Sequence, residues 1–202
     1  MRRTVFDVLT SAVGLVLVVV LLIAGGLLMW GYSYDHNNVR NQLAQQQIFF
    51  PPKAAFAAAK AGTEITPAMI PYLEKYSGQQ LLTGPQAEAY ADHFIAIHLA
   101  EMPYGGIYSK ISTAARAEPT NAKLAALETT SFQGTTLRGL LLEAYGFSKM
   151  GTIMLIGSIA SFILALVMLG FVLLGFRHAR LTPDEVELFV REPSPELAGA
   201  PS

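Results

Sequence analysis

Carboxylates and histidines gather between residues 88 and 101. Glu88 and Asp92 are one helical turn apart, and His93, His98 and Glu101 follow in the same predicted helix. Carboxylate and imidazole groups at such spacings can bind a divalent metal ion or transfer protons. His98 lies on a different helical face from Glu88 and Asp92, however, and the chain has no H-E-x-x-H motif. The sequence therefore predicts a solvated acidic face, with no metal ion at Glu88, Asp92, His93 or His98.

Other kinds of catalysis lack the residues that they need. The chain has no cysteine, which excludes disulfides, thiolate metal sites and thiol catalysis. It has neither a G-x-S-x-G motif nor a glycine-rich phosphate loop. We therefore assign no catalytic, cofactor-binding or metal-binding residue, and we expect a protein that is not an enzyme.

The helices that would position any site include two that cross a membrane. The 202 residues are 52% hydrophobic and only 14% charged, against roughly 25% charged in a soluble domain. No charged residue occurs at 8–34 or at 150–176, and 12–30 is almost purely apolar. Each stretch satisfies the requirement of about 20 apolar residues for a span, and an isolated span has to be helical. We expect two transmembrane helices.

Basic residues indicate the orientation of these spans. Arg2 and Arg3 precede the first span, and Arg177 and Arg180 follow the second, which predicts that both termini are cytoplasmic. A cleaved signal peptide is the alternative for the first span. Its apolar run exceeds the usual ~7–15 residues and ends in 29–32, Met-Trp-Gly-Tyr, with no small-x-small site. We therefore expect an uncleaved anchor in a multi-pass protein of the bacterial plasma membrane.

The expected fold is an all-α membrane protein with two antiparallel transmembrane helices extended into a stalk, capped by a small extracytoplasmic bundle of short helices. The first long helix should continue to about Ile48, before Pro51 and Pro52, and the second should begin at Gly134. The expected domains are 1–34 (cytoplasmic N-terminus and first span), 35–149 (extracytoplasmic), 150–176 (second span) and 177–202 (cytoplasmic tail).

Turn and cap residues divide the middle segment into short helices. No stretch alternates at period two, so we expect no sheet. Thr66-Pro67 and Thr83-Gly84-Pro85 each have the form of a helix cap followed by proline. The expected helices are 66–76, 83–101, 108–115 and 120–132. Pro71 implies a kink in the first of them or a later start.

The cytoplasmic tail contains the most specific local signal. Thr182 with Glu185 forms a capping box at the start of a short helix over 182–190, and the residues beyond Arg191 should be disordered. The apolar side chains of this helix either lie against the membrane or the ends of the spans, or dock a cytoplasmic partner. They are Val186, Phe189 and Val190.

Small residues in both spans predict a helix-packing interface. Such residues let two backbones approach closely, either between the chain's own two spans or with another subunit. They are Gly25, Gly26, Gly157, Ser161 and Ala165. On the stalk, Glu143 stands among leucines, and it either faces water or hydrogen-bonds to the glutamines at 42–47.

Three stretches carry a resemblance to other proteins. They are 41–51 (NQLAQQQIFFP), 86–91 (QAEAYA) and 136–145 (TLRGLLLEAY). The chain resembles a group of uncharacterised two-span membrane proteins of high-GC Gram-positive bacteria, over most of its length. The resemblance implies a two-span topology in a bacterial plasma membrane, and no activity is established for that group.

Two functions fit these observations. The first is a non-enzymatic accessory or scaffold subunit of a membrane or envelope complex, with lipid and other membrane-protein subunits as partners. The second is an extracytoplasmic module that binds or senses an apolar ligand. Its pocket would be lined by Phe49, Phe50, Phe56, Tyr72, Tyr76, Tyr90, Phe94, Tyr104 and Tyr108. The net charge of −1 does not favour nucleic acid as a partner.

Overall fold

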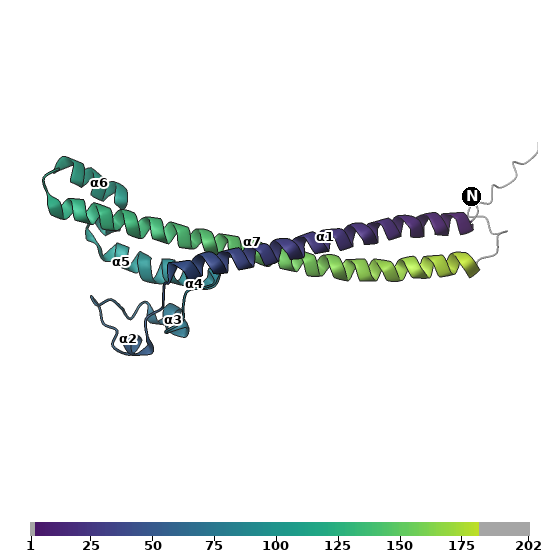
Figure 1. Cartoon of the computed structure of the whole chain (residues 1–202), viewed down its shortest axis with the longest axis horizontal. Helices are drawn as coiled ribbons and strands as arrows, with labels where there is room; N and C mark the ends of the chain where they lie inside the picture. Colours follow the sequence, from purple (N-terminus) through teal and green to yellow (C-terminus); the bar gives the residue numbers. More distant parts are fainter. Residues whose placement is uncertain (1–2, 182–202) are drawn as a thin grey trace, which may run out of the picture. The chain divides into compact units, whose positions relative to one another are not determined.

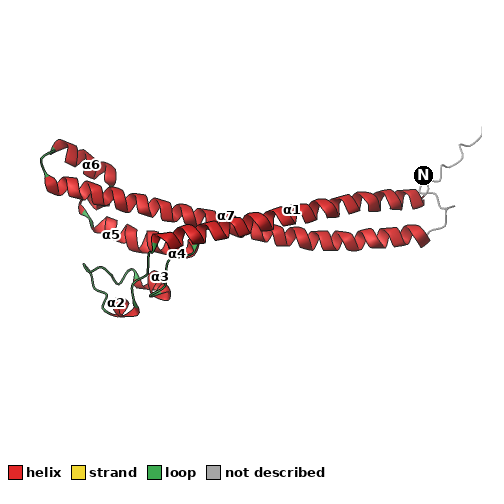
Figure 2. Ribbon diagram, viewed as in Figure 1, coloured by secondary structure: helices red, strands yellow, loops and turns green. Residues whose placement is uncertain are grey.

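The computed structural model describes residues 3–181, and its elements are all helical (Figure 1, Figure 2). The α-helices are α1 (Arg3–Gln46), α2 (Lys53–Ala57), α3 (Ile70–Leu73), α4 (Gly84–Tyr90), α5 (Ala96–Glu101), α6 (Tyr108–Ala117) and α7 (Ala122–Leu181). Short 3-10 turns occupy Glu74–Tyr76 and Pro103–Gly106, and a π-helical turn occupies Ala91–Ile95. Within 3–181 no strand forms, and one isolated antiparallel bridge joins Phe49 and Gln80.

The chain divides into two compact units. One consists of the described residues of 1–29 and 156–202, and we call it the apolar pair. The other is Trp30–Leu155, and we call it the helical domain. Helices α1 and α7 each contribute to both units.

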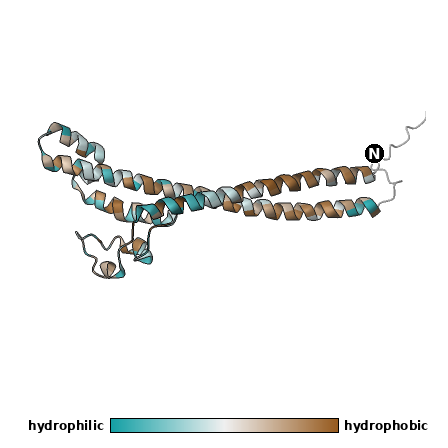
Figure 3. Cartoon of the chain, viewed as in Figure 1, coloured by the Kyte–Doolittle hydropathy of each residue, from teal (hydrophilic) through white to brown (hydrophobic). Residues whose placement is uncertain are grey.

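Hydrophobic residues predominate in both helices of the apolar pair (Figure 3), and many of their large apolar side chains are exposed. Helices α1 and α7 are both long and apolar enough to cross a membrane. In the most apolar window of each, only 17% and 11% of the residues are buried. A core helix of a soluble protein would be mostly buried, so these windows have the exposure expected of helices that face lipid.

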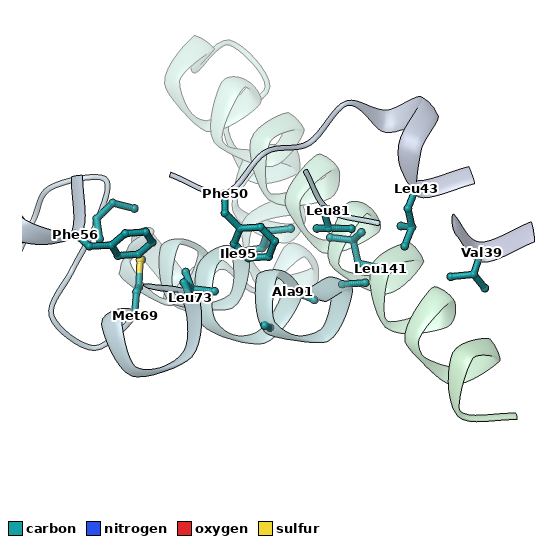
Figure 4. Close-up of a cluster of buried hydrophobic side chains, with 13 residues drawn as sticks. Val39, Leu43, Phe50, Phe56, Met69, Leu73, Leu81, Ala91, Ile95 and Leu141 are labelled. Carbon is teal, nitrogen blue, oxygen red and sulfur yellow. The ribbon is translucent and has the colours of Figure 1, made fainter. Parts of the chain in front are cut away.

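A continuous hydrophobic core holds the helical domain together (Figure 4). Met69, Leu73 and Leu81 are fully buried at its centre, and Leu43 of α1 and Leu141 of α7 join the same cluster. Burying a leucine or methionine side chain contributes about 1.5–3 kcal/mol. The core therefore ties α2, α3, α4 and α5 to α1 and α7 without any disulfide.

The second long helix begins earlier than expected. α7 starts at Ala122, where the Asn121 side-chain oxygen accepts hydrogen bonds from the backbone N–H of Lys123 (3.1 Å) and Leu124 (3.3 Å). The predicted break at Gly134 is therefore wrong, and the expected helix over 120–132 is part of α7. A Cβ at Gly134 would lie 2.9 Å from the Leu99 side chain, so this glycine permits close packing.

Two other helix boundaries also differ from expectation. α1 ends at Gln46 and not at Ile48, because Gln47 adopts a left-handed conformation with φ of 50°. Near Thr66 the α-helix begins only at Ile70, and the buried Thr66 hydroxyl has no hydrogen-bond partner among residues 3–181. Thr66 therefore does not cap a helix.

The expected start at Thr83 agrees with the structure. The Gln86 backbone N–H donates to the Thr83 hydroxyl (3.4 Å), and the Thr83 N–H donates to the Gln86 side-chain oxygen (3.0 Å). This reciprocal capping box fixes the first turn of α4. The helical segment then runs to Glu101 through the π-helical turn.

Candidate functional site: a groove in the helical domain

Three of the candidate side chains of 88–101, Asp92, His93 and His98, have structural partners. The Arg138 guanidinium donates to the Asp92 carboxylate at 2.7 Å. His93 stacks on Tyr72, with ring centroids 3.5 Å apart and planes 4° apart, and His98 Nδ1 donates to the Phe94 carbonyl at 2.8 Å. Among residues 3–181 no group of three or more histidine, aspartate or glutamate side chains is placed to hold a metal ion.

Arg138 is the partner that the sequence reading missed. It lies 46 residues beyond Asp92, on α7, so no local spacing connects the two. The pair joins the π-helical turn of the helical domain to the long helix. The Arg138 and Asp92 side chains are 40% and 35% exposed. Solvent therefore screens their attraction, and the pair contributes little to the free energy of unfolding.

The small residues of the apolar pair lie at different positions around their helices. Gly25 is buried, and a Cβ there would lie 3.0 Å from the Phe162 ring. Gly157 is half-buried, and a Cβ there would lie 3.2 Å from the Leu28 side chain; Ser161 is also half-buried. Ala165 is 1% exposed and packs with Val18 and Val172.

Gly26 lies outside this contact, which departs from the expected interface. It is exposed, and a Cβ there would meet nothing within 4 Å. Successive helical residues are turned by about 100°, so only one of two adjacent glycines can point at the neighbouring helix. Ser158, which the sequence reading did not single out, is fully buried instead, and its hydroxyl donates to the Gly25 carbonyl at 2.8 Å.

A groove of about 400 Å³ runs between α1 and α7 in the helical domain. Its lining includes apolar side chains that the two helices share with the core, namely Val39, Leu43, Leu137, Leu141 and Ala144. The α1 side of the lining is an amide row of Asn38, Gln42 and Gln46, in which Gln42 donates to Asn38 at 3.1 Å. The groove therefore has an apolar wall beside a hydrogen-bonding wall.

The α7 side of this groove is an exposed stripe. Leu140 is 58% exposed and Phe147 is 47% exposed, and both line the groove. Two further exposed apolar residues of α7 are Phe132 and Met150. Both lie within about 80° of Leu140 around the axis of an ideal helix. We call these four residues the α7 stripe.

Glu143 lies on the same face of α7 as the α7 stripe and also lines the groove. It is exposed, and no residue that the structure describes hydrogen-bonds or forms an ion pair with its carboxylate. Glu143 was expected either to face water or to hydrogen-bond to the glutamines at 42–47, and among the described residues it faces water.

Most aromatic residues proposed to line a ligand pocket contact other rings. Phe50 packs against Tyr76 (5.1 Å between centroids) and Tyr90 (5.6 Å), and Tyr90 stacks on Phe94 (4.6 Å). Phe56 is buried in the same core. These side chains fill the helical domain, so the apolar-ligand hypothesis gains no support from them.

The docking residues predicted in the tail, Val186, Phe189 and Val190, lie outside the described residues. Their role stays a prediction.

These features define a class of protein. Over residues 3–181 the protein is mostly helical, without a strand, and two of its helices are long and apolar enough to cross a membrane. It matches no model of a known protein family, no curated protein and no solved structure. Its function therefore has to be argued from its own residues.

Proposed function

We propose that this chain is a non-enzymatic accessory or scaffold subunit of a bacterial plasma-membrane or envelope complex. In this proposal both termini are cytoplasmic, the helical domain lies on the opposite side, and the groove with the α7 stripe docks a helix of another membrane-protein subunit. The two apolar helices support the membrane location, and the flanking Arg2, Arg3, Arg177 and Arg180 support the orientation.

The exposure of Leu140 carries this proposal. Leu140 lies ten residues before Met150, where the apolar stretch begins, which is about 15 Å along the helix axis. The headgroup layer adds only about 5–8 Å on each side of the hydrocarbon core. Lipid therefore does not reach Leu140, and another protein surface is the natural cover for it.

The shape and chemistry of the groove favour a helix as the occupant. Helix-in-groove recognition uses apolar anchors at spacings of three, four and seven residues, and Leu140 and Phe147 have the seven-residue spacing. The stripe continues to Met150 at the membrane boundary, so a partner helix could follow it out of the bilayer. Glu143 and the amide row would select a partner that presents hydrogen-bond donors.

Copurification from the native host tests this function. The tagged chain is purified in mild detergent as wild type and as Leu140→Ser with Phe147→Ser, and the retained proteins are identified. We expect at least one membrane-protein subunit to be retained by the wild type and lost from the double variant, because burial of the two side chains anchors the helix.

The matched control is Phe49→Ser, which removes an equally exposed aromatic (58%) away from the groove. It should retain the same subunit. A double variant that folds and keeps every partner of the wild type contradicts the docking proposal.

A further inference from the structure

A second cavity, of about 310 Å³, lies in the helical domain near residue 35. Three elements meet around it: α1, the start of α4, and α7. Its polar lining residues are Tyr32, Asp35, His36, Thr83, Ser148 and Thr152. It shares only Val39 with the lining of the groove, so it is a separate place on the molecule.

Asp35 gives this cavity its charge. One carboxylate oxygen, Oδ2, is buried and has no hydrogen-bond partner among the described residues. It lies 2.5 Å from the position that a Cβ on Gly151 would occupy, so the carboxylate fits against α7 only because residue 151 is glycine. Burial raises the pKa of Asp35, and the charge of His36 acts in the opposite direction. A buried carboxylate oxygen without a donor is costly.

The hydroxyl donors around Asp35 are largely committed elsewhere. The Thr83 hydroxyl donates to the Gln86 side-chain oxygen (3.1 Å), and the Thr152 hydroxyl donates to the Ser148 carbonyl (3.0 Å). These oxygens can still accept hydrogen bonds. No lysine or arginine is among the residues that line the cavity. The cavity therefore offers hydrogen-bond acceptors and one carboxylate. A ligand that complements it carries a positive charge and donates hydrogen bonds.

Aromatic rings complete this environment. The Tyr32 and His36 rings lie 5.7 Å apart on α1 and both line the cavity. The face of a tyrosine ring attracts an ammonium group within about 6 Å. Trp30 and Tyr34, each two residues before one of these rings, stack at 5.9 Å and are 69% and 64% exposed. Exposed tryptophan and tyrosine at the end of an apolar helix are typical of the membrane–water interface.

We propose that the Asp35 cavity binds a primary ammonium group, with Asp35 as its counter-ion and the threonine and serine oxygens as acceptors. The three N–H donors of such a group match the acceptors present. At the level of Trp30 and Tyr34, an aminated phospholipid headgroup supplies it, and a soluble amine has the same chemistry. This site is independent of the partner helix in the groove.

Lipid binding to the purified, delipidated full chain tests the proposal, with native mass spectrometry as the readout. The probes are phosphatidylethanolamine, phosphatidylglycerol and phosphatidylcholine. We expect phosphatidylethanolamine to bind most tightly, and Asp35→Asn to weaken its binding about tenfold or more. Competition by free ethanolamine at millimolar concentration would show that the ammonium group alone is sufficient. Persistent binding despite ethanolamine would show that the lipid is the source.

Two variants keep the test decisive. Glu101→Gln removes an exposed carboxylate outside both this cavity and the groove, and this variant should bind lipid as the wild type does. Gly151→Ala adds a Cβ 2.5 Å from Asp35 Oδ2, which displaces the carboxylate, and should weaken binding as Asp35→Asn does. Equal binding of phosphatidylethanolamine by the wild type and by Asp35→Asn would overturn the proposal. Equal binding of the three lipids by the wild type would overturn it as well.

Discussion

The Ser158 hydroxyl donates a hydrogen bond to the Gly25 carbonyl at 2.8 Å, across 133 residues of sequence. Both residues are buried in the apolar pair, where Gly25 also admits the Phe162 ring. Small and hydroxyl-bearing residues are the usual means by which apolar helices pack without water. The contact therefore holds α1 and α7 together within this unit.

Replacing Gly25 with leucine should weaken this contact. The added Cβ would lie 3.0 Å from the Phe162 ring, and the remaining atoms would overlap further. We expect a loss of about 1–3 kcal/mol in the free energy of unfolding, the usual cost of overpacking. Denaturant titration in detergent measures it. Gly26→Leu is the control, since Gly26 is exposed and a Cβ there would meet nothing within 4 Å, and it should change stability by less than about 0.5 kcal/mol.

Breaking the Asp92–Arg138 pair should cost little. The two side chains are 35% and 40% exposed, so solvent screens their attraction. A double-mutant cycle with Asp92→Asn and Arg138→Gln should give a coupling energy of about 0.5–1 kcal/mol. A coupling above about 3 kcal/mol would instead indicate a buried pair.

Stability should fall at alkaline pH because of Tyr90. Burial, and secondarily the charge of Glu64, raise the pKa of Tyr90 above its ordinary value of 10.0. The unfolded state then loses the tyrosine proton first, so this contribution is complete below pH 10 and is lost as pH rises through the folded-state pKa. Unfolding measured at pH 8 and pH 11 should show a smaller alkaline loss in Tyr90→Phe. Equal losses would contradict the assignment.

Cysteine labelling tests the orientation of the termini. The chain has no cysteine, so single cysteines can be introduced at Thr129 and at Ser202. In intact cells a membrane-impermeant thiol reagent should label position 129 and should label position 202 only after lysis. Labelling of position 202 in intact cells would place the C-terminus outside.

The features that could be predicted are those that depend on residues close together in the sequence. Long apolar stretches predicted two helices that could cross a membrane, and Thr83-Gly84-Pro85 predicted the start of α4. The predicted helix start at Gly134 was wrong because the local sequence is the same whether a glycine interrupts a helix or lets a neighbouring side chain pack closely. Only the position of Leu99 distinguishes these two roles.

The candidate sites were harder to predict because they depend on distant residues. The sequence predicted that Asp92 lies on a solvated acidic face, and its ion pair with Arg138, 46 residues further along the chain, has no local signal. The groove requires the amide row of α1 to face the stripe of α7, about a hundred residues later. The amide-rich 42–47 and the position of Glu143 were signals of this groove, but they did not show that Leu140 and Phe147 are exposed.

Photocrosslinking at Leu140 tests the docking proposal most directly. A benzophenone amino acid is placed at Leu140 in the full chain, in the native host, and the adducts are identified. Thr135 is the control position, since it is also exposed but lies about 140° around α7. We predict a single protein adduct from position 140 and none from position 135. Adducts with lipid alone at position 140, or the same protein adducts at both positions, would contradict the proposal that this face docks a partner helix.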